Sequence, residues 1–303
     1  MDPLSDVLGL LKPSTYGFRG LDAGGDWAIA YPPAEGVKCF AVHTGACLIA
    51  LEGGDAPMEL EAGDFILVPA RAAFSLCSAI GAPVTEAFAF FPSFPAGETG
   101  ILNGGGTCSG VGGFFDFTGL HTEQLLGILP PIVHIRAEET KAALGWLIER
   151  LMRELRDPQP GGTLMAGHLA QTLLIEALRL HLAERSPHSA GWLFALADKQ
   201  MRAVISAMHA EPARRWTLAD LARVGGMSRS SFAVRFKETV GEPAMDYLTR
   251  WRMMVAADRL ASGRVSIATV APAVGYESES AFGAAFKRTF GHSPREFAKA
   301  MAA

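Results

Sequence analysis

Apolar and polar residues alternate in two different rhythms, which divide the chain into a front part of short strands and a back part of helices. Up to about residue 118, short apolar runs are separated by turns rich in glycine and proline, as in WAIAY (27–31), VKCFAVH (37–43), ACLIALE (46–52) and VTEAFAFF (84–91). Short strands at this spacing predict a small β-sandwich or barrel. The stretch NGGGTCSGVGG (103–113) lacks the Lys-Ser/Thr pair that completes a phosphate loop, so we interpret it as a flexible turn.

Helical periodicity begins after residue 135. Residues 138–157 and 162–184 each place apolar side chains at spacings of three and four, which is the pattern of an amphipathic helix. The two stripes consist of Leu144, Leu147, Ile148, Leu151 and Leu155, and of Leu169, Leu173, Leu174, Ala177 and Leu178. The sequence DPQPGG (157–162) between them predicts an antiparallel pair, which packs on the β domain or against a second copy of the protein. The segment RSPHSAG (185–191) is predicted to be a linker.

A helix-turn-helix pattern follows in the segment WTLADLARVGGMSRSSFAVRFKETVG. Thr217 is in the N-cap position of a helix that runs from Leu218 to about Val224, and the glycine pair 225–226 predicts a tight turn. Ser228 caps a second helix, in which Phe232 and the aromatic residue four positions later face inward. A helix, a tight turn and a capped second helix together can place the second helix in a major groove.

The same plan recurs about fifty residues later in SIATVAPAVGYESESAFGAAFKRTFG. The matched positions are Ile267 with Leu218, Val270 with Leu221, Ala271 with Ala222, Gly275 with Gly226, Phe282 with Phe232, Phe286 with Phe236 and Gly291 with Gly241. Between the copies, residues 242–263 predict one continuous helix, with an apolar face of Leu248, Trp251, Met254, Val255 and Leu260. A rigid connection would space the two recognition helices for successive major grooves, roughly 34 Å apart on one face of DNA.

Charge separates the two parts of the chain further. Residues 198–303 contain 16 Lys and Arg against 10 Asp and Glu, a net charge of +6, whereas residues 1–197 contain 11 against 21, a net charge of −10. The basic part is therefore the candidate for a polyanionic partner. The N-terminal sequence MDPLSD is acidic and lacks the basic flank of a signal peptide, and the four cysteines form no CxxC pair. We expect reduced thiols, a cytoplasmic location and no membrane partner.

The last hundred or so residues resemble the AraC/XylS-type DNA-binding domain. The resemblance depends on WTLADLA, MSRSSFAVRFK, YLTRWRM, VGYESESAF and FKRTFGHSP in this order and spacing. The front part resembles the cupin-like ligand-binding domain of one branch of that family, through LEGGDAPMELEAGDFILVPARAAF and GILPPIVHI. The resemblance implies a cytoplasmic bacterial transcription regulator that responds to a small molecule and pairs with itself, with RNA polymerase as a further candidate partner.

The predicted fold class is α+β, with four parts. These are a cupin-like ligand-binding β-barrel (1–128), a helical pair for dimerisation (129–186), a linker (187–197), and an all-α domain of two helix-turn-helix units joined by a long helix (198–303). The predicted function is sequence-specific binding of double-stranded promoter DNA under the control of an effector in the front domain. We expect a regulator that forms a homodimer, rather than an enzyme.

The residues predicted to contact DNA are Ser228, Arg229, Ser230, Val234, Lys237, Ser278, Ser280, Lys287, Arg288 and Arg295. Related domains often carry a base-reading arginine two residues after the first inward aromatic residue, where this chain has Val234 and Ala284. Glu277 and Glu279 suit a helix N-terminus but repel phosphate, and Pro272 is expected to disturb its helix. We therefore expect the first unit to supply most of the specificity and the second mainly to contact the DNA backbone.

The residues predicted to line an effector pocket are Trp27, Tyr31, Phe40, His43, Phe65, Phe74, Phe88 and Phe90, which favours an apolar or aromatic ligand. Two alternatives remain for the front domain. A metal-dependent cupin enzyme would need several converging histidines, but this region offers only His43, and Phe74 stands where related sequences often have histidine. A thiol-based redox sensor would use Cys39, Cys47, Cys77 or Cys108, whose apolar context favours inert thiols. No metal or other cofactor is expected.

Overall fold

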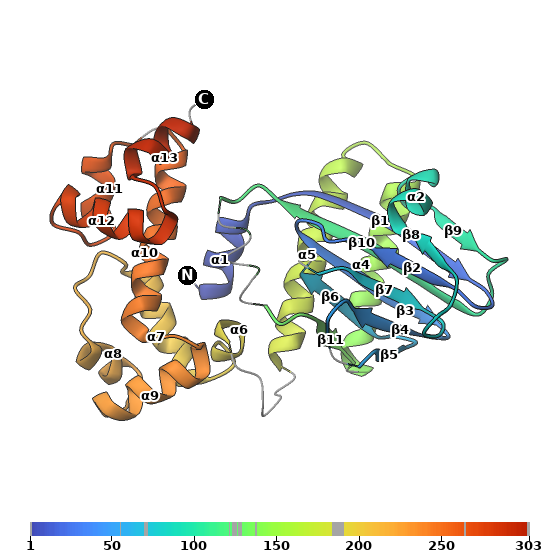
Figure 1. Ribbon diagram of the computed structural model, residues 1–303, viewed down its shortest axis with the longest axis horizontal. Coiled ribbons are helices and arrows are strands. Elements are labelled where there is room, and N and C mark those ends of the chain that lie inside the picture. The colour runs from blue at the N-terminus through green and yellow to red at the C-terminus, as the bar shows by residue number, and fades with distance from the viewer. Residues whose placement is uncertain are drawn as a thin grey trace. The chain divides into compact units, whose positions relative to one another are not determined.

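The computed structural model describes residues 2–54, 56–69, 72–120, 122, 126, 129–136, 138–183, 191–263 and 265–301. The chain divides into two compact units, whose elements are labelled in Figure 1. The sheet unit comprises Pro13–Phe117 and Leu129–Glu184, and the helical unit comprises Met1–Lys12, Thr118–Ile128 and Arg185–Ala303. Apart from Gly191, the predicted linker segment 185–191 lies outside the described residues.

The strands of the sheet unit form two β-sheets. The first has the strand order β11-β6-β3-β10-β1-β9, and the second has the order β5-β4-β7-β2-β8. The strands of the first are β1 (Pro13–Ala23), β3 (Val37–Thr44), β6 (Phe65–Pro69), β9 (Thr99–Leu102), β10 (Cys108–Phe117) and β11 (Val133–Ile135). Those of the second are β2 (Ala28–Tyr31), β4 (Ala46–Leu51), β5 (Met58–Glu61), β7 (Phe74–Cys77) and β8 (Val84–Glu86). Among the described residues neither sheet closes on itself, so the cupin-like domain has the sandwich form, which is one of the two forms that the strand spacing predicted, and not that of a closed barrel.

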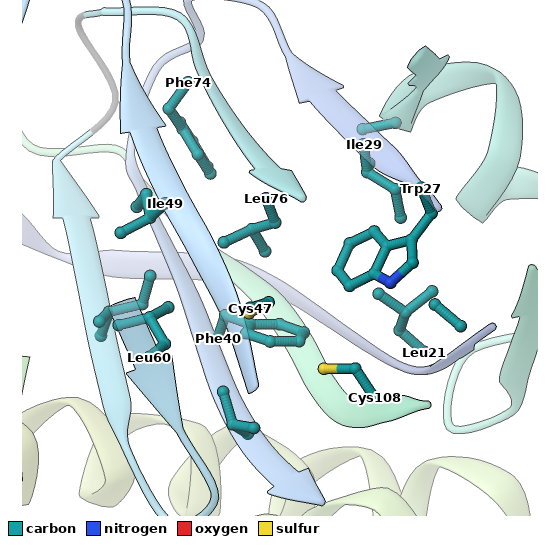
Figure 2. Close-up of a cluster of buried hydrophobic side chains, with 14 of the residues drawn as sticks. Leu21, Trp27, Ile29, Phe40, Cys47, Ile49, Leu60, Phe74, Leu76 and Cys108 are labelled. Carbon is teal, nitrogen blue, oxygen red and sulfur yellow. The ribbon is translucent and has the colours of Figure 1, made fainter. Parts of the chain in front are cut away.

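A hydrophobic core joins the two sheets. Its buried side chains come from both of them, as Figure 2 shows for Phe40 of β3, Ile49 of β4 and Leu76 of β7. Trp27, which precedes β2, is fully buried in the same cluster. The alternation of apolar and polar residues along the strands therefore does bury one face of each sheet, as the sequence predicted.

The glycine-rich stretch 103–113 is not only a turn, because its second half belongs to β10, which pairs with both β1 and β3. The glycines make room for aromatic rings of the neighbouring strands. A Cβ atom on Gly113 would lie 2.4 Å from the ring of Phe18, and one on Gly110 would lie 2.6 Å from the ring of Phe40. The prediction of a flexible turn over the whole stretch was wrong, since these glycines serve close packing inside a sheet.

The apolar run 84–91, predicted as one strand, is a strand for only three residues. After β8 the chain forms a short helix α2 (Ala87–Phe90) and the 3-10 helix η1 (Phe91–Ser93). Pro92 has no N–H to donate to a sheet ladder, which favours departure from the sheet at this point. The helical turn also lets Phe90 and Phe91 both pack against the core, whereas successive residues of a strand would point to opposite faces.

The two helices that follow have the predicted bounds to within a residue. Helix α4 (Glu138–Arg156) and helix α5 (Gly162–Ala183) pack against each other, and the predicted stripes are buried apart from Leu155, which is half-buried. The pair also contacts strands of the six-stranded sheet, where the hydroxyl of Tyr16 in β1 donates to the carbonyl of Thr163 at 3.0 Å. The helical pair thus packs on the β domain, which is one of the two arrangements that the sequence left open.

The helical unit consists of helices from both ends of the chain. These are α1 (Pro3–Leu11), α6 (Trp192–Ala195), α7 (Lys199–Ala210), α8 (Leu218–Val224), α9 (Arg229–Val240), α10 (Ala244–Ala261), α11 (Ile267–Ala273), α12 (Glu279–Phe290) and α13 (Pro294–Met301). The sequence pattern did not predict α1, which starts with an Asp2 cap and Pro3 at its first position. Among the described residues, no helix combines the length and the apolar character needed to cross a membrane.

Candidate DNA-binding face and effector cavity

The first helix-turn-helix unit has the local geometry that the sequence predicted. The hydroxyl of Thr217 accepts from Asp220 N at 3.1 Å, and the Asp220 carboxylate accepts from Thr217 N at 3.2 Å, which completes a capping box at the start of α8. Gly226, with φ of +65°, turns the chain so that Met227 N donates to Ala222 O at 2.9 Å. Ser228 then caps α9 by accepting from the N–H of Ser231.

The second unit repeats these contacts. Ser266 caps α11 through Thr269 N at 3.3 Å, and Tyr276 N donates to Ala271 O at 3.0 Å, as Met227 N does to Ala222 O in the first copy. Gly275, with φ of +87°, makes the turn, but one extra residue, Glu277, lies between it and the cap of α12 at Ser278. The duplication therefore extends to individual hydrogen bonds, with an insertion of one residue in the second turn.

Both recognition helices are held by a pair of phenylalanines four residues apart. Phe232 and Phe236 of α9 are fully buried with ring centroids 5.5 Å apart, and Phe282 and Phe286 of α12 are fully buried with centroids 5.6 Å apart. The central helix α10 supports both copies, and its predicted apolar face is buried except at the half-buried Val255. One continuous helix thus links the two units, as the sequence predicted.

The residues predicted to contact DNA lie in α9 and α12 or at their N-caps, apart from Arg295, which lies in α13. All ten are exposed: Ser228, Arg229, Ser230, Val234, Lys237, Ser278, Ser280, Lys287, Arg288 and Arg295. Among the described residues, the side chains of Arg229, Lys237, Lys287, Arg288 and Arg295 form no ion pair. Each recognition helix therefore presents free positive charge on a solvent-facing surface.

Other charged residues of this region have partners and serve the structure. Arg235 of α9 donates to Asp198 Oδ2 at 2.5 Å and to Gln200 Oε1 at 2.7 Å, which fastens the recognition helix to the start of α7. Glu277, the inserted residue, forms an ion pair with Arg215. Pro272 does not end its helix, because α11 continues to Ala273. The pairing of Glu277 reduces the repulsion toward phosphate that its sequence position suggests.

A cavity of about 150 Å³ lies in the sheet unit. It is lined by Gly17, Arg19, Tyr31, Lys38, Cys39, Phe40, Ile66, Val68, Phe74, Leu76, Ala87, Phe88, Phe91, Pro92, Gly112, Gly113 and Phe114. Tyr31 and Phe74 stack with ring centroids 4.5 Å apart and an interplanar angle of 8°. The walls are mostly apolar and aromatic, with a few polar groups, which is the usual character of a small-molecule site.

Four of the eight residues predicted to line a pocket do line this cavity, namely Tyr31, Phe40, Phe74 and Phe88. The other four lie elsewhere: Trp27 is in the core, Phe65 is buried away from the cavity, Phe90 packs against the core, and His43 is exposed. Sequence reasoning missed the two cationic lining residues, Arg19 and Lys38. The spacing of Lys38 and Phe40 in β3 could have indicated Lys38, because residues two apart in a strand share a face.

Comparison with known proteins agrees with both halves of this geometry. Residues 2–183 match the cupin family and residues 221–300 match a helix-turn-helix domain family. A putative AraC-like transcription regulator from Streptomyces antibioticus is 41% identical over 303 residues, which cover 99% of each chain. The chain belongs to the AraC-like transcription regulators. It is therefore a DNA-binding regulator rather than an enzyme.

Two less similar proteins also match over almost the full chain. The HTH-type transcriptional regulator AlkR of Acinetobacter baylyi is 28% identical, over 98% of this chain and 99% of AlkR. A crystal structure of ToxT from Vibrio cholerae with a bound unsaturated fatty acid covers 94% of this chain and 95% of ToxT, with 13% identity and a TM-score of 0.37.

In this AraC-like regulator the N-terminal helix α1 packs onto helices α7 and α10 of the helical unit. Asp6 Oδ2 lies 3.2 Å from His209 Nδ1 in α7, and Lys12 Nζ lies 2.5 Å from Asp258 Oδ1 in α10. Burial lowers the pKa of His209, and the hydrogen bond and negative charge of Asp6 oppose that shift. No local sequence signal identifies this contact, because its partners are about two hundred residues apart.

The four cysteines of the regulator are buried. The thiols of Cys47 in β4 and Cys108 in β10 interact with each other, which raises the pKa of Cys47 and lowers that of Cys108. Burial raises the pKa of Cys39 and Cys77. In the part of the chain that the structure describes, no group of three or more His, Cys, Asp or Glu side chains has the arrangement of a metal site.

Proposed function

We propose that this AraC-like regulator binds specific operator DNA with α9 and α12, and that a small molecule in the cavity of the sheet unit controls this binding. The observation that supports DNA binding most strongly is the duplicated helix-turn-helix. In both copies the second helix buries two phenylalanines on one side and, on the other, exposes cations that form no ion pair with a described residue. Such a helix fits a major groove, where side chains can read base edges while cations contact phosphates.

The two copies take different shares of the recognition in this proposal. In α9, Arg229 and Ser230 lie in the first turn, which is the part of a recognition helix that meets base edges. Val234, 58% exposed, offers an apolar surface of the kind that contacts the methyl group of thymine. In the second copy, Lys287 and Arg288 lie in the last turn of α12, where they suit contacts to the DNA backbone.

Control by an effector is supported by the cavity and by the chain connection that leads away from it. Strand β1 contributes Gly17 and Arg19 to the cavity wall, and the same strand follows α1 directly at Lys12–Pro13. Helix α1 in turn contacts α7 and α10, which belong to the same helical unit as α9 and α12. A ligand that changes the position of β1 would therefore alter the strain on α1 and shift the population of DNA-binding conformations.

We also propose that two copies pair through the helical pair α4–α5, and that the regulator acts in the cytoplasm, where operator DNA is accessible. Trp146 of α4 and Leu164 of α5 are 61% and 68% exposed, which is unusual for large apolar side chains. Light scattering would test the pairing. A monomer in the Trp146→Glu variant and a dimer in the wild type would support this interface, and a wild-type monomer at micromolar concentration would contradict it.

The test of the proposed function uses the full chain. Selection from random duplexes, followed by footprinting of the selected sites, should yield one protected region with two contact zones about one helical turn apart. The logarithm of the binding constant should fall linearly with the logarithm of salt concentration, with a slope of about −0.9 for each phosphate contact. Enrichment of no sequence would contradict operator-specific binding, and protection that does not change with any of a broad panel of metabolites would contradict effector control.

A further inference from the structure

The cavity of the sheet unit contains two cations, Arg19 and Lys38, that form no ion pair with a carboxylate of the described residues. Lys38 of β3 is half-buried, and its ammonium group lies 4.7 Å from the ring centroid of Phe114 and 5.7 Å from that of Phe88. Within the described residues the ammonium group has no hydrogen bond and no ion pair. Contacts with aromatic rings shelter a cation only partly, so Lys38 is positioned to gain from an anion.

The register of the six-stranded sheet explains why both cations face the same space. Residues directly opposite each other on neighbouring strands point to the same side of a sheet. One row across strands β1, β10, β3 and β6 reads Arg19, Gly112, Phe40 and Ile66, and the next row reads Gly17, Phe114, Lys38 and Val68. All eight of these residues line the cavity. Lys38 is thus flanked by two apolar residues, and Gly112 leaves open the space beside Arg19.

The surroundings of each cation leave room for an external carboxylate. The Nε of Arg19 donates to the carbonyl of Phe94 at 2.7 Å, which fixes the side chain. The two terminal nitrogens of its guanidinium group form no hydrogen bond to a described residue. Burial lowers the pKa of Lys38, and the negative charge of Asp116 opposes this shift without forming an ion pair. A cation that is partly removed from water is costly unless it is paired. An anionic ligand would remove this cost.

The opposite wall and the size of the cavity restrict the rest of the ligand. Tyr31 and Phe74 form a stacked aromatic surface, and Phe91 lies next to it with a centroid 6.3 Å from that of Tyr31. A volume of about 150 Å³ accommodates one benzene-sized group. Aromatic rings pack favourably against such walls in offset or edge-on arrangements. A long flexible chain would extend beyond this volume.

We propose that the effector is a small aromatic carboxylate, whose ring lies between Tyr31, Phe74 and Phe40 and whose carboxylate meets Lys38 and Arg19. This inference rests on the proposed function, since it specifies the ligand class of the cavity that controls DNA binding. In this arrangement the aromatic walls supply affinity for the ring of the ligand. A neutral ligand of the same shape would bind more weakly, because it would leave both cations without a negatively charged partner.

The test is calorimetric titration of the full-length protein with benzoate, its ring-substituted derivatives and the neutral isostere benzamide. At least one carboxylate of the set should bind, and its amide should bind at least ten times more weakly. The Lys38→Met variant should weaken carboxylate binding at least tenfold, while Lys38→Arg, which keeps the charge, should stay within a few-fold of the wild type. The matched control is Lys299→Met, which removes an exposed lysine from the helical unit.

Two results would overturn the ligand class. One is the absence of binding by every benzoate at millimolar concentration, and the other is equal binding of acid and amide that the Lys38→Met variant leaves unchanged. Footprinting of the selected operator with the same preparations separates this failure from failure of the proposed function. Retained operator binding that responds to a neutral or non-aromatic compound would refute the aromatic carboxylate alone. The contact between Lys38 and the carboxylate would also be contradicted if the Lys38→Arg variant unfolded normally on heating but no longer bound the carboxylate.

Discussion

Asp6 and His209, which are 203 positions apart in sequence, are held 3.2 Å apart between Oδ2 and Nδ1. The other ring nitrogen of His209 lies 2.7 Å from the hydroxyl of Tyr247, and the imidazole stacks on Trp251 with centroids 3.7 Å apart. The first helix of the chain is therefore part of the unit that contains both helix-turn-helix copies. This relationship makes α1 the most direct chain connection between β1 and the DNA-binding helices.

Substituting Asp6 with alanine should destabilise the helical unit. It leaves the Nδ1 group of the buried His209 without its partner, and such a loss costs about 1–3 kcal/mol. Urea unfolding followed by circular dichroism measures the change. Asp26→Ala, at an exposed position, is the control and should stay within about 0.5 kcal/mol of the wild type. Equal unfolding midpoints for the two variants would show that the pair adds nothing to stability.

The Asp6→Ala variant should also lose the effect of effector binding on operator affinity. If α1 transmits the state of β1, Asp6→Ala should bind operator with the same affinity in the presence and absence of effector, while calorimetry still detects effector binding. Fluorescence anisotropy with a labelled operator measures this response. A response as large as that of the wild type would exclude α1 as the connection.

Acid should weaken the folded state through His209. Burial lowers its pKa below the ordinary value, which is about 6.5, so below that pH the unfolded chain binds a proton more readily than the folded chain does. The free energy of unfolding should therefore fall as the pH drops below about 6.5 and stay constant above it. Urea midpoints at pH 7.5 and 5.5 should differ more for the wild type than for His209→Gln.

The comparison between the two proteins isolates this residue. Partial desolvation also lowers the pKa of His43, but that residue is present in both proteins and contributes equally to each. If the two proteins lose the same stability between the two pH values, His209 is not responsible for the acid sensitivity.

Arg229 and Lys287 should affect DNA binding in different ways. Arg229 lies at the start of α9, so Arg229→Ala should cost about 1–3 kcal/mol on the selected operator and much less on a scrambled duplex. Lys287 lies in the last turn of α12, so Lys287→Ala should weaken both duplexes alike and reduce the salt slope by about one. Equilibrium binding at several salt concentrations gives both quantities. Identical behaviour of the two variants would remove the proposed asymmetry.

The glycines that end the recognition helices should tolerate alanine poorly. Gly241 and Gly291 have φ values of +95° and +79°, and nothing lies within 4 Å of a Cβ atom at either position. The cost of Gly241→Ala or Gly291→Ala is therefore the backbone strain alone, about 1–2 kcal/mol. Gly283→Ala is the matched control, because this residue lies inside α12 with open space around it. Gly283→Ala should stabilise the protein by about 0.5–1 kcal/mol. If all three variants change the free energy of unfolding in the same direction, the assigned helix ends are contradicted.

Alkylation of the cysteines tests the alternative of a thiol sensor. Reaction requires the thiolate, and all four thiols are buried, three of them with raised pKa. Labelling of the native protein at neutral pH should be at least about a hundredfold slower than in denaturant, because it waits for local or global opening. Mass spectrometry identifies the sites. Fast labelling of Cys108 in the native protein, or oxidation that changes operator binding, would favour redox sensing.

Several features of the fold could be predicted because they repeat at short range. The bounds of α8 and the caps at Thr217 and Ser228 follow from residues within one helical turn of each other. The prediction failed where neighbours from other strands decide the conformation. The glycines of β10 form a strand because the rings of Phe18 and Phe40 need the space, and that requirement is visible only when the strands are side by side.

The candidate sites show the same division. The exposed face of the recognition helices follows from a period of 3.6 residues, so the predicted DNA-contacting residues are indeed exposed. The cavity depends on which strands are neighbours, so only half of its predicted lining was placed there and Arg19 and Lys38 were missed. An aromatic residue in a strand can face the core, the cavity or solvent, and its own sequence does not decide between them.

The sequence by itself determined that the chain ends in two copies of one helix-turn-helix and that its front half is a β domain, since both conclusions depend on local periods that each segment carries within itself. Only the tertiary structure decided that α1 packs with α7 and α10, that two cations without an ion-pair partner among the described residues share an aromatic cavity, and that the β domain is an open sandwich. These features arise from contacts between residues far apart along the chain, and such contacts leave no period in the sequence to be read.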